Sequence, residues 1–175
     1  TLKILNELDY AIDCSTVPHT DFSMYQGPDF TQLKSSTPYW LNNKLLEIPL
    51  SVDYVGSLSQ FGSPFYKTTQ KEHLVKLKIP AILSRLGLFE RIRLSPEGHS
   101  TSEMIRLTKS MLKKNHKVFC LTYHSSTLMP GGSPYVQNQQ QLDLFLHTIE
   151  QYLEFFNYEL HGSFSSINEF HKRSK

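Results

Sequence analysis

Short apolar runs alternate along this chain with longer stretches in which apolar residues recur every three or four positions. The short runs are rich in β-branched and aromatic residues and are bounded by turn residues, so they predict four strands. These strands cover residues 10–15, 45–52, 91–95 and 118–123. Pro49 gives the second strand an irregular or edge position, because proline cannot donate a hydrogen bond to a neighbouring strand.

The stretches with helical spacing predict helices between and after these strands. They cover residues 2–8, 72–86, 100–114, 139–156 and 166–172. The second helix is interrupted at Pro80 and ends at Gly87. Ser100 or Thr101 caps the third, and Glu103 in its first turn suits the helix dipole. The Gly-, Ser- and Pro-rich stretches 16–38 and 53–69 are long surface connections, and long loops in a compact domain are usually functional.

Helical segments between consecutive strands predict parallel βαβ units with right-handed crossovers. The chain has 175 residues, of which 39% are hydrophobic and 19% are charged. This length and composition describe one ordinary globular domain with a real core. The sequence therefore predicts a single α/β domain over residues 1–175.

Charge and hydropathy exclude two classes of partner. A net charge of +2, with the cations scattered, does not indicate a nucleic-acid partner. No run of about 18 apolar residues is present, so we expect no membrane span. Cys14 and Cys120 both lie in apolar runs, as free core thiols of a reducing compartment or as an incidental pair. They do not fix the localisation, although they slightly favour the cytoplasm.

The stretch 117–135 carries the first candidate for chemistry. Its apolar run stops at His124 and opens into a Gly/Pro-rich loop. A histidine at the carboxyl end of a strand, facing a long loop, lies where α/β sheets and barrels place their active sites. A histidine there can act as a general acid or base near neutral pH. The alternative, to which the sequence gives equal weight, is a histidine that only hydrogen-bonds to its own loop.

Glu97 is the second candidate, because it lies just beyond the strand that precedes the His124 strand. If the two strands are adjacent, both side chains meet at one face. A carboxylate beside an imidazole fixes the tautomer and raises the pKa of the imidazole, which suits a general acid. The alternative is that Glu97 only favours the dipole of the helix that follows it.

His19, Asp21 and Asp13 form a third group near the end of the first strand. A His and an Asp two residues apart are too few ligands to define a metal site, so substrate contact or simple turn-making is the better interpretation. Loop aromatics such as Trp40 suit either the flat faces of sugars or the pinning of loops to the core. The chain has no Gly-rich phosphate loop, no Gly-x-Ser-x-Gly elbow and no Cys-x-x-Cys pair.

Several segments, in order, resemble the polysaccharide deacetylase, or NodB-homology, family. Residues 121–124, Leu-Thr-Tyr-His, are similar to the family's Leu-x-x-His motif, and residues 124–135 are similar to the segment that follows it in one branch. Residues 5–18 resemble the family's helix and strand with an Asp-Ser-Ser-like end. Residues 46–49 resemble its next strand, and residues 93–98 its penultimate one.

This resemblance implies the carboxyl-terminal portion of a distorted (β/α) barrel, related to the TIM barrel, with about four βα units. It also implies metal-dependent removal of acetyl groups from N-acetylated sugars, with a divalent, zinc-like metal in the intact domain. Its general acid maps to His124, and Glu97 is the carboxylate that supports it. Leu121 would line the acetyl pocket, and the expected substrate contacts are Tyr123, His19, Asp21 and Tyr135.

The metal-binding and base motifs of the family have no counterpart in this sequence. We therefore expect a partial domain that lacks the amino-terminal half of the barrel and is inactive by itself. Its expected partners are an acetylated saccharide and, through an open barrel edge, a second copy of the chain. The alternative function is a non-catalytic domain of this fold that binds a carbohydrate or a protein partner.

Overall fold

The strands form two small sheets in the computed structural model, which describes residues 2–33 and 35–175. The first sheet has the order β1 (Ile12–Asp13), β3 (Leu45–Glu47), β2 (Tyr39–Leu41). β1 runs parallel to β3, whereas β2 is antiparallel to it. The second sheet pairs β4 (Val52–Val55) with β5 (Glu90–Arg93) in antiparallel register. The fold is thus mixed α/β, and no barrel closes within the described residues.

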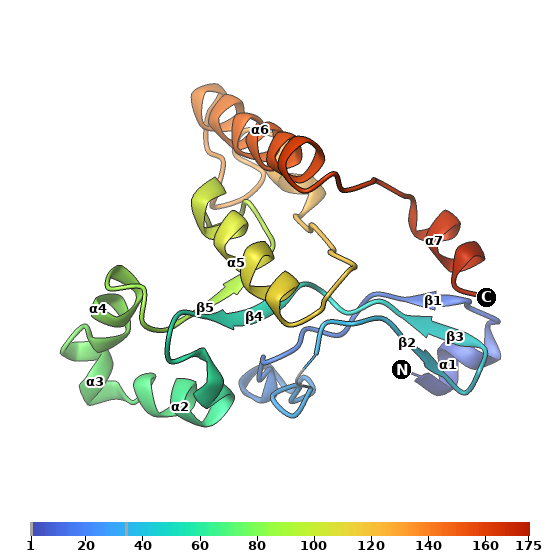
Figure 1. The fold of residues 1–175 in the computed structure, drawn as a ribbon, viewed down its shortest axis with the longest axis horizontal. Helices are drawn as coiled ribbons and strands as arrows, with labels where there is room; N and C mark the ends of the chain where they lie inside the picture. The colour runs from blue at the N-terminus through green and yellow to red at the C-terminus, as the bar shows by residue number, and fades with distance from the viewer. Residues whose placement is uncertain (1, 34) are drawn as a thin grey trace.

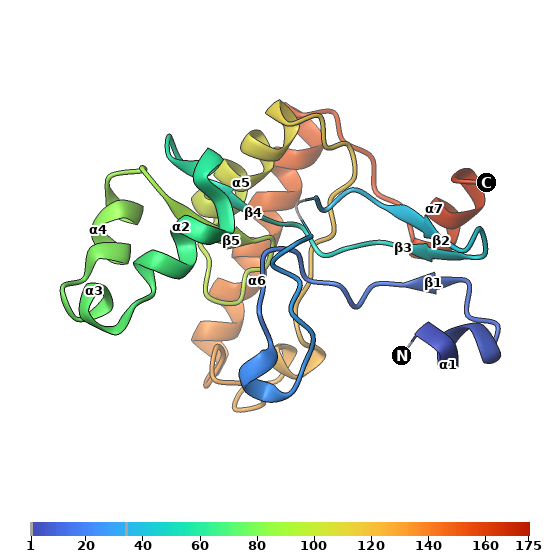
Figure 2. The same cartoon turned by 90° about the horizontal axis from the view of Figure 1, so that it is seen from below.

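Three regions follow one another along the long axis of the molecule (Figures 1 and 2). The three-stranded sheet lies at one end with α1 (Leu2–Glu7) and α7 (Ile167–Arg173). The β4–β5 sheet lies in the middle, under α5 (Thr101–Lys113) and α6 (Gln139–Glu154). The short helices α2 (Gly62–Thr69), α3 (Glu72–Lys76) and α4 (Ile79–Arg85) gather at the other end.

The main core lies between the β4–β5 sheet and α5 and α6. In Figure 1, α5 is sandwiched between this sheet and α6. The apolar faces of these elements form one buried cluster, whose members are Val55, Ile92, Leu94, Met104, Leu107, Met111, Tyr152 and Phe155. Spacings of three and four residues along α5 place its apolar side chains on the face that covers the sheet. This packing fixes the positions of the segments that precede and follow α5 relative to each other.

The predicted helices 2–8, 100–114, 139–156 and 166–172 are confirmed. Ser100 caps α5 in a reciprocal capping box: its hydroxyl accepts from the Glu103 N–H, and its own N–H donates to the Glu103 carboxylate. Ser166 caps α7 in the same way. α6 continues into a π-helical turn, η4 (Phe155–Glu159). Short 3₁₀ turns complete the list: η1 (Ser23–Tyr25), η2 (Ser59–Phe61) and η3 (Ser125–Leu128).

The prediction of parallel βαβ units is wrong for β4 and β5. The stretch 72–86 is two helices of five and seven residues, and Lys78 between them has a positive φ of 57°. Such short helices do not carry the chain back across a sheet as one crossover helix does. The chain instead returns antiparallel to β4. The predicted strand 45–52 also divides around Pro49 into β3 and the start of β4.

The prediction of a buried strand over residues 118–123 is also wrong. This stretch is extended and half-buried but belongs to no strand pair. Two backbone N–H groups tie it to its neighbours: that of Cys120 donates to the Ser51 hydroxyl at 2.8 Å, and that of Thr122 to the Leu94 carbonyl at 3.1 Å. β4 and β5 pair with each other, and residues 48–51, which precede β4, have no regular secondary structure. The segment therefore meets an irregular edge and forms no ladder.

The β2–β3 hairpin and α2 were not predicted. Asn42 and Asn43 both adopt positive φ, 52° and 55°, as at the two central positions of a type I′ turn, and the Lys44 N–H closes the turn on the Leu41 carbonyl at 3.2 Å. The Asn-Asn pair was the signal that sequence reasoning missed. At the end of β4, Gly56 has φ 112°, and a Cβ there would lie 2.3 Å from the Leu88 carbonyl oxygen. That position accepts only glycine.

Among the helices of the described residues, none combines the length and the apolar character that a membrane span requires.

Candidate functional site

Glu97 and His124 form a carboxylate–imidazole pair at one end of the β4–β5 sheet. The His124 Nδ1 atom lies 2.7 Å from Glu97 Oε2, and the His124 backbone N–H donates to Oε1 at 2.9 Å. The hydroxyl of Thr127 also donates to Oε1, at 2.6 Å. The Glu97 side chain is 1% exposed, whereas the His124 side chain is 70% exposed. A buried anion thus supports an imidazole that faces solvent.

The fold around α5 brings these two residues together. Glu97 follows β5, and its N–H donates to the Ser95 hydroxyl at 3.2 Å. The chain then turns at Gly98, which has φ 81°, and enters α5. After α5, the extended segment 118–123 runs back beside Leu94, so that His124 lies at the same end of the sheet as Glu97. The 3₁₀ turn η3 directly after His124 aims the Thr127 hydroxyl at the same carboxylate.

Hydrogen bonding keeps Glu97 ionised despite its burial. Burial alone raises the pKa of this carboxyl group, but the hydrogen bonds from Thr127 and His124 outweigh it and lower the pKa below its usual value of 4.5. A carboxylate on Nδ1 selects the tautomer in which Nδ1 carries hydrogen. Nε2 of His124 is then the atom that accepts or donates a proton, on the exposed side of the ring. The arrangement suits general acid–base chemistry.

Three other predicted site residues differ in how far their side chains are exposed to solvent. Tyr123 is 40% exposed and packs edge-on against Phe145, with 5.7 Å between the ring centroids. Tyr135 is 45% exposed, and its ring lies beside the Gly98 turn, where it would be 3.7 Å from a Cβ on that glycine. Leu121 is half-buried against the main core. The two tyrosines are thus partly exposed, next to His124 in sequence and beside the Gly98 turn, whereas Leu121 packs on the core.

His19 and Asp21 make their contacts elsewhere. His19 is 7% exposed, its Nε2 lies 3.6 Å from Asp53 Oδ1, and its ring packs on Tyr54. Asp21 accepts a hydrogen bond from the Ser23 N–H at 2.9 Å and lies 3.9 Å from the Lys67 ammonium. None of their contacts within the described residues involves Glu97 or His124. This geometry corresponds to turn-making for Asp21 and to loop packing for His19.

Asp53 is a buried charged residue that sequence reasoning missed. Lys114 donates to its Oδ2 at 2.7 Å, and His19 lies against its other oxygen. Burial lowers the pKa of His19, and the attraction of Asp53 opposes this while Lys114 and Arg91 reinforce it. Asp53 lies in a stretch predicted as a loop, and its burial depends on the antiparallel pairing of β4. No local pattern could have revealed it.

Glu47 is the second buried acid that the sequence did not single out. Its side chain accepts a hydrogen bond from the Thr16 hydroxyl at 2.6 Å, while its Oε2 atom has no partner among the described residues. Burial raises the pKa of this carboxyl group, and the nearby Asp13 adds to the effect. The end of the β1–β3 pair therefore holds a carboxyl group that gains a proton more readily than usual.

The described residues do not fit the metal centre that the family resemblance implies. Within residues 2–33 and 35–175, no three His, Cys, Asp or Glu side chains lie close enough together to hold a metal ion. The buried pair of Asp53 with His19 already has the Lys114 ammonium as the counter-ion of its carboxylate. We therefore assign no metal ligands.

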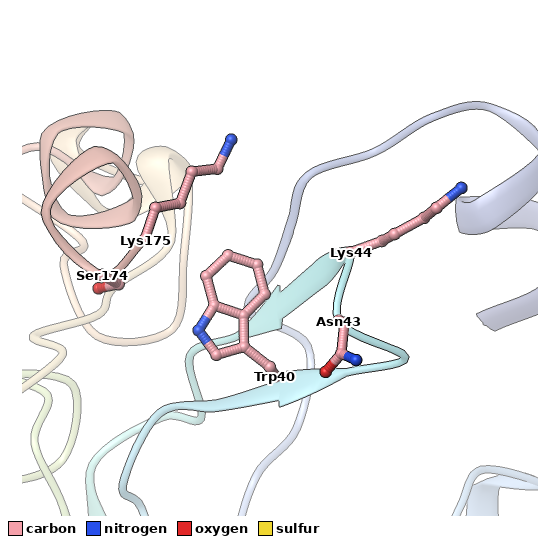
Figure 3. A pocket seen from close by; sticks show the side chains of 5 residues that line it. All are labelled: Trp40, Asn43, Lys44, Ser174 and Lys175. Atoms are coloured by element: carbon pink, nitrogen blue, oxygen red, sulfur yellow. The ribbon is translucent and has the colours of Figure 1, made fainter.

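A separate open pocket of about 500 Å³ surrounds Trp40 (Figure 3). Trp40 lies between the end of the chain after α7, with Ser174 and Lys175, and Asn43 at the tip of the β2–β3 hairpin. Lys44 also lines the pocket, and its ammonium group points away from the indole. The pocket thus brings together an indole ring, an amide and a hydroxyl group.

Comparisons of this chain with protein families, with curated proteins and with solved structures find no significant match.

Proposed function

We propose that Glu97 and His124 are the proton-transfer pair of a hydrolase that removes acetyl groups from N-acetylated sugars. One observation carries the proposal: a buried carboxylate, 1% exposed, binds Nδ1 of an imidazole that is 70% exposed. A histidine that only ties down its own loop has no need of a buried, ionised partner on its ring. The resemblance of residues 121–135 to the NodB-homology family supplies the substrate class.

In this mechanism His124 acts through Nε2. A water molecule adds to the amide carbonyl carbon and loses a proton to solvent. The protonated imidazole then gives its Nε2 proton to the amine nitrogen as the C–N bond breaks, which releases the free amine and acetic acid, and the acid ionises to acetate. Glu97 stays ionised throughout and orients the ring through Nδ1. Tyr123 and Tyr135, which are both partly exposed, are the proposed contacts to the sugar. No step is assigned to a metal ion, because the described residues offer no ligand set for one.

The proposal extends to the fold as the carboxyl-terminal portion of a distorted (β/α) barrel. The parallel β1–β3 pair supports this assignment, as does the meeting of two side chains at one end of neighbouring extended segments. The antiparallel pairing of β4 with β5 departs from it. In this reading the open side of the barrel is the free edge of β1.

Acetate release from an N-acetylated chitooligosaccharide, measured with added Zn²⁺ on the intact domain of which this chain is the proposed carboxyl-terminal portion, tests the proposal. His124→Ala should lower the rate by roughly 10²–10⁴-fold, the usual contribution of a general acid. His147→Ala is the matched control, since His147 is an exposed histidine that contacts an exposed glutamate, Glu150, at 3.4 Å. Equal rates for the wild type and His124→Ala, or no acetate release by the wild type, would overturn it.

The Trp40 pocket favours a second candidate, a non-catalytic carbohydrate-binding domain. Its indole, amide and hydroxyl groups suit stacking and hydrogen bonding to a sugar ring. Trp40 is the single tryptophan, so its fluorescence reports this pocket alone. Saturable quenching by the oligosaccharide that is lost in Asn43→Ala, without acetate release, would select this function. An unchanged spectrum would eliminate it.

A further inference from the structure

The extended segment 117–123 leaves one of its backbone edges without hydrogen bonds. The N–H groups of Cys120 and Thr122 point toward the sheet and are bonded there. The N–H groups of Phe119, Leu121 and Tyr123, which alternate with them, have no partner among the described residues, and neither do the carbonyl groups of 117–123. Unpaired backbone groups along a half-buried edge carry a free-energy cost, and a paired strand removes it.

An apolar groove of about 530 Å³ runs along this open edge. Residues 117–121 form one wall, and the linker 163–166 with α7 forms the other. In both Figure 1 and Figure 2 the linker and α7 lie on the side of the segment away from β4 and β5. Phe164 and Ile167, at 58% and 49% exposed, present apolar surface to the groove. Apolar side chains thus lie beside the unpaired backbone.

The charged residues that line the groove are all basic. Lys117 and Arg173 are among its lining residues, and no aspartate or glutamate of the described residues lines it. A ligand that carries carboxylates therefore meets favourable charges at both walls. A hydrocarbon chain would fill the apolar space but would leave the backbone edge unpaired. A peptide strand satisfies the apolar walls, the backbone and the cations together.

We propose that the groove binds an extended peptide that adds as a strand to residues 117–123. The N–H and carbonyl groups of Phe119, Leu121 and Tyr123 pair with the peptide backbone. Alternate apolar side chains of the peptide enter the groove, and its acidic residues approach Lys117 and Arg173. The site is separate from the proton-transfer pair, and its occupant is a segment of another protein.

The test uses a fluorescein-labelled peptide of alternating valine and threonine with an aspartate at each end, and its binding is followed by fluorescence anisotropy. The control peptide is the same sequence methylated on every internal backbone nitrogen. We expect saturable binding of the first, and an affinity at least about tenfold lower for the second, since two or more backbone hydrogen bonds are lost. Equal affinity for the two peptides, or no saturable binding, overturns the proposal.

Two further measurements locate the site. The double variant Lys117→Glu with Arg173→Glu should prefer a lysine-ended peptide over the aspartate-ended one, and an unchanged preference counts against the assignment. Amide hydrogen exchange should slow at Phe119, Leu121 and Tyr123 when the peptide binds; slowing only elsewhere overturns it. A concentration-dependent dimer in sedimentation that the peptide dissociates would assign the edge to a second copy of this chain instead.

Discussion

Glu97 binds His124 at two points, through the backbone N–H at 2.9 Å and through the ring Nδ1 at 2.7 Å. The first contact fixes the position of the His124 backbone, and the second fixes the orientation of its ring. A single carboxylate therefore sets both the position and the tautomer of the imidazole. This double contact separates the pair from the exposed His147–Glu150 pair on α6, whose single contact is 3.4 Å long.

Thr127→Val should weaken the pair while keeping the shape of the side chain. The substitution removes the hydroxyl that donates to Glu97 Oε1 at 2.6 Å and leaves that buried oxygen with one donor fewer. We expect the free energy of unfolding to fall by about 1–3 kcal/mol. The pKa of Glu97 should rise relative to the wild type, and a carboxyl NMR titration measures it. Thr127→Ser keeps the hydroxyl and should retain the wild-type value.

Glu97→Gln should change the acid stability of the protein. The folded pKa of Glu97 lies below the ordinary 4.5 of an unfolded chain, so its stabilising contribution is complete above pH 4.5. The contribution disappears as the pH falls through the folded pKa. Urea unfolding at several pH values should show wild type more stable than the variant by a constant margin from pH 7 to 5, and by a shrinking margin below 4.5. A margin independent of pH would contradict this.

Glu150→Gln is the matched control for that series. Glu150 is exposed, and its replacement removes a surface contact with His147 alone. Exposed ion pairs contribute little to stability. The control should therefore follow the wild-type unfolding curve at every pH.

Because three histidines are buried, the free energy of unfolding should fall as the pH is lowered from 7 to 5. Burial is the main cause that lowers the pKa of His19, His99 and His116 below 6.5. In this range the unfolded chain takes up protons that the folded chain does not, so the free energy of unfolding falls as the pH drops through 6.5. His99→Gln should reduce the slope measured by urea unfolding. His147→Gln, at an exposed site, should leave the slope unchanged.

Leu107→Ala should test whether α5 is the centre of the core. Leu107 is fully buried in the cluster between the sheet and α6. Its truncation leaves a cavity, and we expect a loss of about 2–5 kcal/mol in the free energy of unfolding. Leu144→Ala removes the same atoms from a side chain that is 65% exposed on α6 and should cost far less. Similar losses for the two variants would place the core elsewhere.

Local signals explain what the sequence predicted correctly. The boundaries of α5 and α7 follow from capping boxes at Ser100 and Ser166, each formed within a few residues. The meeting of Glu97 and His124 follows from their positions on the two sides of one helix. Thr122 N–H bonds to the Leu94 carbonyl, which establishes that the two extended segments are neighbours.

Pairing between distant segments explains what the sequence did not predict. Whether β5 runs parallel or antiparallel to β4 depends on how the stretch 56–89 returns, and this stretch forms several short helices in place of one crossover helix. An apolar run such as 118–123 has the composition of a buried strand wherever it lies, and only its neighbours determine whether it is paired. The burial of Asp53 likewise depends on His19 and Lys114, which are far from it in sequence.

The position of α5 between Glu97 and His124 also sets the order in which the pair can assemble. The two residues are 27 positions apart, and the helix that fills half of this interval is the centre of the core. Closing a loop of that length costs entropy before its contacts form. The carboxylate and its donors therefore meet only after α5 has docked on the sheet. In refolding, the pair should form late, and substitutions at Thr127 should speed unfolding more than they slow folding.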